Sequence, residues 1–285
     1  MFLRKTIPAL ALFLAAGLIT AVQSDRLSPY PMTDATVRQW KLPGKLREIS
    51  GLALAPDGRL FAVADESAVV FEIDYANGAL IKAFALGNPA IKGDFEGIAW
   101  LNDRLYLTTS DGVLYSSAEG DNGAHLDAER VDTGLGETCE VEGLTEQAET
   151  GRLFFVCKAR RRGSQSPGLH VWEWSTASRE FVGSIRIPIA DIEQALKVDD
   201  FNPSGIVMDR DGNSFLIVAA KQKSLVQVAA DGGLVAARRF RQTSRHKQAE
   251  GIELTSSGKL LIADEGGDKK ARLAVYEPRP GGEPK

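Results

Sequence analysis

Short apolar runs separated by turn residues recur along most of the chain. Runs such as Leu60–Ala64 and Leu153–Cys157 are five residues long and rich in Leu, Val and Phe, which is typical of strands rather than helices. Turns such as Pro56-Asp57-Gly58 stand between them, and Gly, Asn and Asp tolerate the backbone conformations of tight hairpins. Only Ile189–Lys197 has a pattern that favours a helix. The hydrophobic pattern therefore predicts an all-β protein.

A five-residue motif occurs five times: a polar or acidic residue, any residue, Glu or Ser, Gly, and an aliphatic residue. The third positions of successive copies are 46, 46, 62 and 46 residues apart. The longer interval fits an insertion that includes the predicted helix. The five copies are Glu48-Ile49-Ser50-Gly51-Leu52, Asp94-Phe95-Glu96-Gly97-Ile98, Glu140-Val141-Glu142-Gly143-Leu144, Asn202-Pro203-Ser204-Gly205-Ile206 and Gln248-Ala249-Glu250-Gly251-Ile252.

Each copy is followed by further turns and strands, so that one period contains four antiparallel strands. Four such strands in about 46 residues are the signature of a β-propeller blade. After Glu250 only 35 residues remain, enough for three strands, and we expect Ala35–Leu42 to supply the fourth and remove an exposed sheet edge. The prediction is a five-bladed β-propeller with an N-terminal strand closing the last blade. Its single domain spans residues 35–280, with blades starting near residues 48, 94, 140, 202 and 248.

The N-terminus has the pattern of a targeting segment. Arg4 and Lys5 precede an uncharged run of 16 residues, Ile7 to Val22, which is shorter than the roughly 20 residues of a membrane span. A signal peptide cleaved after Ser24 fits this pattern, and an uncleaved membrane anchor is the alternative. In either case we expect an exported protein, periplasmic or anchored to the inner membrane and facing the periplasm, with residues 1–24 outside the fold.

The net charge of −4 shows no excess of basic residues of the kind that binds nucleic acid, so we expect no nucleic-acid partner. Cys139 and Cys157 lie on two predicted neighbouring strands. A disulfide across the hairpin and two buried free thiols are both compatible with this spacing. The three histidines, His125, His170 and His246, share no repeat position, and we expect them on the surface or in loops.

The repeated motif predicts acidic rings around the central channel. The first strand of each blade lines a propeller's channel, and residues two apart on a strand face the same side. Two carboxylates about 6 Å apart repel by roughly 3 kcal/mol at an effective dielectric constant of about 20, so converging glutamates must hold protons or a cation. The expected rings are Ser50, Glu96, Glu142, Ser204 and Glu250, and Glu48, Asp94, Glu140, Asn202 and Gln248.

Two interpretations of these rings remain open. Oxygen ligands suit calcium or magnesium, and the imidazole and thiolate ligands typical of zinc are missing from the repeated positions. Alternatively, the repeated glycine is the real requirement, because blades crowd together at the channel, and the Glu and Ser side chains only bond exposed backbone amides.

The motifs, taken in order, resemble the SdiA-regulated family of bacterial exported propellers. The resemblance rests on the Glu-x-Ser-Gly-Leu start, the Asp-Phe-Glu-Gly-Ile-Ala segment, the Gln-Ala-Glu-Gly-Ile segment and the Ala-Asp-Glu strand ends, and covers about residues 40–280. It implies a five-bladed propeller with a calcium site. The residues that we expect to bind the metal are Glu96, Glu142 and Glu250, followed by Glu48, Glu66 and Glu265.

Three functions are compatible with this sequence. The first, which we favour, is a non-enzymatic propeller that binds calcium in or near its channel and binds an unknown protein or small molecule on one rim. The second is a metal-dependent hydrolase of lactone or phosphoester type, although the sequence offers no clear general base. The third is a scaffold without metal.

Overall fold

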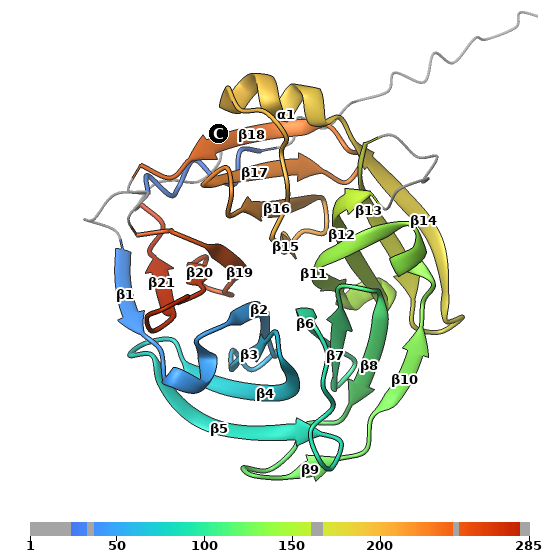
Figure 1. The fold of residues 1–285 in the computed structure, drawn as a ribbon. Coiled ribbons are helices and arrows are strands. Elements are labelled where there is room, and N and C mark those ends of the chain that lie inside the picture. The colour runs from blue at the N-terminus through green and yellow to red at the C-terminus, as the bar shows by residue number, and fades with distance from the viewer. Residues whose placement is uncertain (1–23, 33–36, 161–167, 242–244, 280–285) are drawn as a thin grey trace, which may run out of the picture.

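The computed structural model describes residues 24–32, 37–160, 168–241 and 245–279. Five sheets, antiparallel apart from one short added strand, surround a central axis, as in a five-bladed β-propeller (Figure 1). Because each sheet has its first strand innermost, β2, β6, β11, β15 and β19 come together around the axis. The fold class predicted from the repeat is therefore confirmed.

The strands follow the predicted order along the chain. Blade one contains β2 (Ile49–Leu54), β3 (Leu60–Ala64), β4 (Ser67–Asp74) and β5 (Ala79–Leu86). Blade two contains β6 (Phe95–Leu101), β7 (Arg104–Thr109), β8 (Val113–Ser117) and β10 (Glu129–Asp132). Blade three contains β11 (Cys139–Gln147), β12 (Arg152–Arg160), β13 (Leu169–Ser175) and β14 (Glu180–Ile187), and blade four contains β15 (Gly205–Met208), β16 (Ser214–Ala219), β17 (Ser224–Ala229) and β18 (Leu234–Arg239).

Blade five joins the two ends of the chain. It contains β19 (Ala249–Leu254), β20 (Leu260–Asp264) and β21 (Arg272–Tyr276), and its outer strand is β1 (Val37–Lys41). Strand β1 pairs antiparallel with β21 along its whole length, which removes the sheet edge that β21 would otherwise expose. The predicted closure by an N-terminal strand is confirmed.

In the described parts of the chain, helical structure occurs in the connections between strands. The predicted helix is α1 (Ile189–Leu196), which buries Ile192 and Leu196 against blades three and four. Short 3₁₀ turns occur at Gly44–Leu46, Leu135–Glu137 and Ala148–Thr150.

The hydrophobic core consists of layers between neighbouring blades. One layer combines Phe61 of blade one with Trp100 of blade two, whose rings stack with centroids 5.2 Å apart. Another combines Phe154 of blade three with Phe215 of blade four, at 5.2 Å in an edge-to-face arrangement. Burying one such side chain contributes about 2 kcal/mol or more, so these layers hold the ring of blades together.

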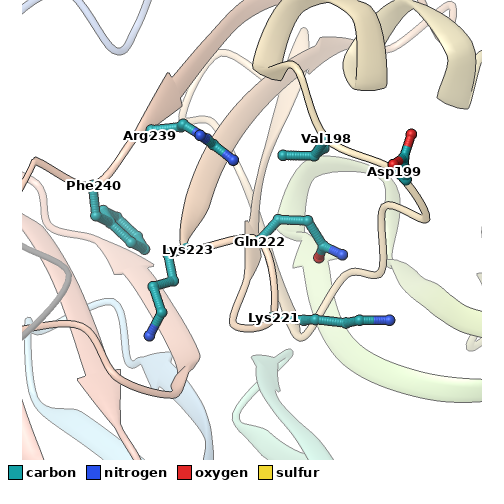
Figure 2. Close-up of a pocket in the computed structure, with 7 residues that line it drawn as sticks. All are labelled: Val198, Asp199, Lys221, Gln222, Lys223, Arg239 and Phe240. Atoms are coloured by element: carbon teal, nitrogen blue, oxygen red, sulfur yellow. The ribbon is translucent and has the colours of Figure 1, made fainter.

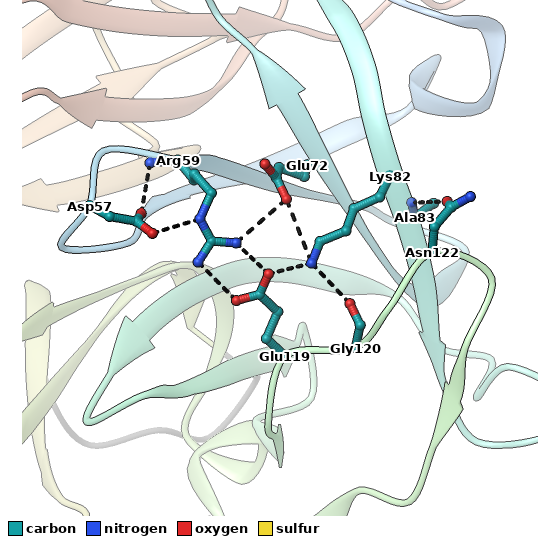
Figure 3. Close-up of polar contacts among 8 residues, drawn as sticks. All are labelled: Asp57, Arg59, Glu72, Lys82, Ala83, Glu119, Gly120 and Asn122. Atoms are coloured by element: carbon teal, nitrogen blue, oxygen red, sulfur yellow. Dashed lines mark hydrogen bonds and ion pairs between the residues drawn. The ribbon is translucent and has the colours of Figure 1, made fainter.

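The connection from β8 to β10 is fastened to blade one, which the sequence did not predict. Strand β9 (His125–Leu126) adds in parallel to the outer edge of β5. Figure 3 shows that Glu119 lies between Arg59 and Lys82 and bonds to both. Lys82 also donates to the carbonyl of Gly120 at 3.0 Å, and the buried Glu72 lies 3.5 Å from Arg59. This ionic network ties the two blades together at their periphery.

The segment that follows the predicted targeting sequence docks on the propeller. Leu27 and Tyr30 are buried in the core between blades four and five. Gln227 donates to the carbonyl of Ser24 at 2.9 Å and accepts from the backbone of Arg26 at 2.7 Å. Residues 1–23 of the predicted targeting segment lie outside the described residues. Within the described residues, no helix is long and apolar enough to cross a membrane.

Cys139 and Cys157 form a disulfide between β11 and β12, with Cα atoms 5.8 Å apart. Of the two alternatives left open by the sequence, the structure contains the bridged form.

Candidate functional site

A β-bulge places the repeated polar residue of the inner strands. In blade two the strand pairing passes from Phe95 opposite Thr109 to Gly97 opposite Thr108, which leaves Glu96 as the additional residue. A bulge redirects the extra side chain and bends the strand. The same irregularity occurs at Ser50 in β2 and at Glu250 in β19, and β11 has a comparable one around Glu142.

The glycine of each repeated motif allows the blades to approach one another. A Cβ atom added at Gly97 would lie 2.6 Å from the backbone nitrogen of Leu144 in the next blade, and one at Gly205 would overlap the carbonyl oxygen of Glu250. The repeated glycine therefore has a steric cause of its own, as one of the two interpretations of the sequence proposed. This cause leaves the role of the carboxylates open.

Three predicted ligands, Glu96, Glu142 and Glu250, converge at the axis and form what we call the channel group. Burial raises the pKa of Glu96 to about 10, and the charges of Glu142 and Glu250 contribute to the shift. Burial, followed by the charge of Glu142, raises the pKa of Glu250 to about 8. Each carboxylate is thus destabilised by removal from water and by its neighbours.

One ammonium group compensates part of this charge. Lys158 Nζ lies 2.9 Å from Glu142 Oε1. Burial raises the pKa of Glu142 and Lys158 opposes the increase, so that the result is about 7. Although burial lowers the pKa of Lys158, its bond to Glu142 and the other nearby carboxylates raise it overall. Among the described side chains, the three carboxyl groups of the channel group therefore have one paired cation, Lys158.

The remaining predicted ligands, Glu48, Glu66 and Glu265, belong to a second cluster with Asp65 and Asp94, which we call the rim group. Burial and then the charge of Glu48 raise the pKa of Asp65. Burial and then the charge of Asp65 raise the pKa of Glu265. The Oδ1 atom of Asp65 is buried and has no hydrogen-bond partner among the described residues. The predicted ligands are thus divided between two clusters, and Asp65 and Asp94 were not among them.

The two groups are electrostatically continuous. The charge of Asp94 raises the pKa of Glu96, and the charge of Glu265 raises the pKa of Glu250. Arg47 offsets part of the negative charge at the rim through an ion pair of 2.8 Å with Glu48. The inner ends of blades one, two and five therefore form one acidic region.

The carboxylate oxygens of the channel group and the rim group are donors that fit a hard cation, although these side chains do not surround a common point. Within the described parts of the chain, no three acidic, histidine or cysteine side chains are grouped as a metal site. The unpartnered Asp65 oxygen and the glutamates of the channel group are oxygen donors, which is the chemistry that calcium or magnesium accepts. The carboxylates would have to rotate toward an ion.

Two cavities define the space at the axis. A narrow space of about 10 Å³ is lined by residues of all five inner strands, including Ser50, Glu96 and Glu250. This is about the room that one water molecule occupies. A wider pocket of about 620 Å³ begins at Glu142 and Glu250 and extends over blade four. A small ion and a larger ligand could therefore be held side by side.

His246 lies in the connection before β19, as the prediction of histidines on the surface or in loops allows, but it is buried rather than on the surface. This side chain is 2% exposed and bridges two buried partners: Nδ1 lies 2.7 Å from Asp264 Oδ2, and Nε2 lies 2.6 Å from the hydroxyl of Tyr276. The two partners lie on β20 and β21, 18 and 30 residues from His246 in the sequence, so no local sequence motif predicts the cluster. The cluster is enclosed and serves blade five structurally.

Fold and site together define a five-bladed β-propeller with an acidic channel. The SdiA-regulated family matches residues 28–266, and the chain belongs to that family. No curated protein matches the sequence.

Among solved structures, the glutaminyl cyclase of Myxococcus xanthus is similar with 14% identity and a TM-score of 0.55, covering 85% of this chain and 97% of that one. A luciferin-regenerating enzyme is similar with 8% identity and a TM-score of 0.53, covering 85% of this chain and 95% of that one. At these identities the likeness concerns the fold alone.

Proposed function

We propose that this propeller binds a divalent cation, calcium by the chemistry of its donors, in the central channel. The observation that carries the proposal is the channel group. Glu142 is buried and Glu96 and Glu250 are half-buried, all three have raised pKa values, and among the described residues Lys158 is paired with Glu142 alone. A divalent cation would compensate the negative charge that burial and then mutual repulsion make unfavourable at these carboxylates.

Calcium suits the donors better than softer metals. Carboxylates and water are its usual ligands, and it accepts variable coordination numbers and irregular geometry. That tolerance matters here because the three glutamates come from bulges in β6, β11 and β19 and do not form a symmetric cage. Bound calcium would supply positive charge and, at an open position, polarise an oxygen ligand.

The rim group supports the proposal in a different way. Glu48, Glu66 and Glu265 add negative charge next to the channel, and Asp65 contributes an unpartnered buried oxygen. Converging charge of one sign raises the local concentration of counter-ions. We propose that the rim group attracts the cation and supplies further ligands.

We further propose that the protein is exported and acts as a binding module. The disulfide between β11 and β12 favours an oxidising compartment. The segment after residue 24 docks on the propeller through the backbone of Arg26 and the buried Leu27, so cleavage after Ser24 would leave this docking in place. The pocket of about 620 Å³ beside the channel has room for a small molecule or a partner's side chains.

A metal-dependent hydrolase of lactones or phosphoesters is the second candidate, and one observation favours it. Glu142 lines the wide pocket, and its pKa of about 7 is close to the value at which a general base works. In that function Glu142 would accept a proton from water in the pocket, while Lys158, bonded to Glu142, would hold the carboxylate in place. Hydrolysis of 4-nitrophenyl phosphate and of a simple lactone, compared between wild type and Glu142→Gln, tests this candidate.

Calcium titration by calorimetry tests the main proposal. We expect wild-type protein to bind calcium and the triple variant to lose binding while remaining folded. The triple variant is Glu96→Gln, Glu142→Gln and Glu250→Gln.

A matched control separates the site from total charge. It removes three carboxylates that are exposed, at Glu137, Glu149 and Glu180, and should bind calcium as wild type does. Equal loss of binding in both triple variants, or no binding in the wild type, would contradict the proposal. Magnesium in place of calcium, with the same dependence on the channel group, would correct the identity of the ion.

A further inference from the structure

A second pocket on blade four is lined mainly by cationic and apolar side chains. It measures about 600 Å³ and is lined by Val198, Asp199, Lys221, Gln222, Lys223, Arg239 and Phe240. Figure 2 shows Arg239, Lys223 and Phe240 at one end and Asp199 at the other. It contains none of the proposed cation ligands, so its properties can be considered independently of the channel.

The turn that forms one wall is held in a fixed conformation. Lys223 has a φ of 48°, which is uncommon for a residue with a side chain. Its backbone nitrogen donates to the carbonyl of Ala220 at 3.2 Å, and its carbonyl accepts from Phe240 at 2.9 Å. Residues held in such conformations by their surroundings are frequent at binding sites. The backbone of Lys223 is therefore held in place by the fold.

Gln222 joins this turn to the opposite wall. Its side chain is 8% exposed, and its amide nitrogen donates to the carbonyl of Asp200 at 2.6 Å. Its amide oxygen accepts from the backbone of Asn202 at 3.3 Å. The pocket is consequently bounded by two connections that are bonded to each other.

The charges in the pocket are unbalanced. Lys221 is paired with Asp200 at 2.9 Å. Lys223 and Arg239 have no carboxylate within ion-pair distance among the described residues, and Lys223 Nζ reaches only the carbonyl of Lys247 at 3.4 Å. Asp199 is the one acidic residue in the lining. Two cations on fixed backbone therefore face an open cavity.

Arg239 lines the pocket, whereas the adjacent Arg238 is bound in an ion pair elsewhere. Arg238 and Arg239 are consecutive at the end of β18, so their side chains point to opposite faces of the sheet. Arg238 pairs with Asp25 of the docked N-terminal segment at 2.5 Å. Arg239 lines the pocket instead. One arginine serves the fold, and its neighbour is available to a ligand.

We infer that this pocket binds a small soluble organic anion that carries a phosphate or carboxylate group, held between Arg239 and Lys223. Guanidinium and ammonium groups recognise such oxygen anions through charge-assisted hydrogen bonds. The apolar part of the ligand would pack on Phe240 and Val198, which form the hydrophobic lining. Because Lys221 and Lys223 also line the wide pocket at the channel, the bound anion lies close to the channel mouth.

Calorimetry with phenyl phosphate, benzoate and neutral benzamide tests the inference on the full chain in the presence of EDTA. We expect wild type to bind the two anions and not the amide. Arg239→Gln and Lys223→Asn should each weaken phenyl phosphate binding about tenfold. Asparagine is chosen at position 223 because it adopts the left-handed conformation of this turn.

Arg238→Gln is the control, because it removes the same charge from the same strand outside the pocket. Equal weakening by Arg238→Gln and Arg239→Gln would overturn the inference, since binding would then follow net charge. Binding of the anions only when calcium is present, unchanged by Arg239→Gln, would also overturn it. Binding in EDTA supports the anion site even if the proposed calcium site fails its own test.

Discussion

Replacing Glu96 by glutamine should stabilise the cation-free protein at neutral pH. In the folded protein, burial and then the charges of neighbouring glutamates raise the pKa of Glu96 to about 10, against an ordinary value of 4.5. At pH 7 the folded state therefore keeps a proton that the unfolded state releases. A carboxyl group with a raised pKa contributes its full stability below about pH 4.5 and loses it as the pH rises towards the folded pKa.

The size of this effect follows from the difference between the two states. One pH unit corresponds to about 1.4 kcal/mol, so between the ordinary pKa and pH 7 this group lowers the free energy of unfolding by on the order of 3 kcal/mol. Glutamine has nearly the same shape and carries no charge, so it avoids the loss. We expect Glu96→Gln to match wild type near pH 4 and to exceed its stability increasingly towards pH 8.

Urea unfolding between pH 4 and pH 8, with EDTA and then with calcium, measures both parts of the argument. In EDTA the variant should be the more stable protein at pH 7. With calcium the order should reverse, because only wild type gains the binding energy of the ion. Glu180→Gln, at an exposed position on β14, is the control and should follow wild type throughout. If Glu96→Gln shows the same pH dependence as wild type in EDTA, the reasoning about the channel group is refuted.

Three further predictions concern the framework of the site. Gly205→Ala should prevent folding, because the added Cβ would overlap the carbonyl oxygen of Glu250, whereas Gly44→Ala meets no atom within 4 Å and should have a normal melting temperature. His246→Ala should cost about 3 kcal/mol in urea unfolding because it leaves a buried carboxylate without its partner, and a loss below 1 kcal/mol would show that the cluster relaxes. Cys157→Ser opens a disulfide that spans 18 residues and should lower the free energy of unfolding by about 3 kcal/mol. A reducing agent should lower the stability of wild type by the same amount and should not change that of the variant.

The architecture could be predicted because it repeats. A motif at a nearly constant interval carries the same information five times, so the blades, their number and the closure by a strand within Ala35–Leu42, observed as Val37–Lys41, followed from spacing and hydrophobic pattern. Strand β9 and the docking of Leu27 and Tyr30 occur once each. Their contacts depend on surfaces that exist only after folding, and no periodic signal reports them.

The site was predictable only in part, for a related reason. The repeat identified Glu96, Glu142 and Glu250 as residues of the channel, where their electrostatic interactions place them. Simple alternation did not reveal the bulge that directs them there, because alternation assumes a regular strand. Asp65 follows the second strand of its blade, and its backbone bonds to Glu48 in the same blade and to Phe95, next to Asp94, in the following blade. Such a cluster depends on tertiary geometry, as does the burial of His246.

The measurement that most directly tests the central claim is a crystal structure of the protein grown with manganese in place of calcium, with the ion located by its anomalous scattering. We predict one strong anomalous peak at the channel axis, within bonding distance of carboxylate oxygens of Glu96, Glu142 and Glu250. A peak confined to the rim group around Asp65 would show that the ion binds outside the channel. The absence of any peak at the axis at saturating manganese would mean that protons alone neutralise the glutamates, and it would contradict the claim that this propeller binds a divalent cation in its channel.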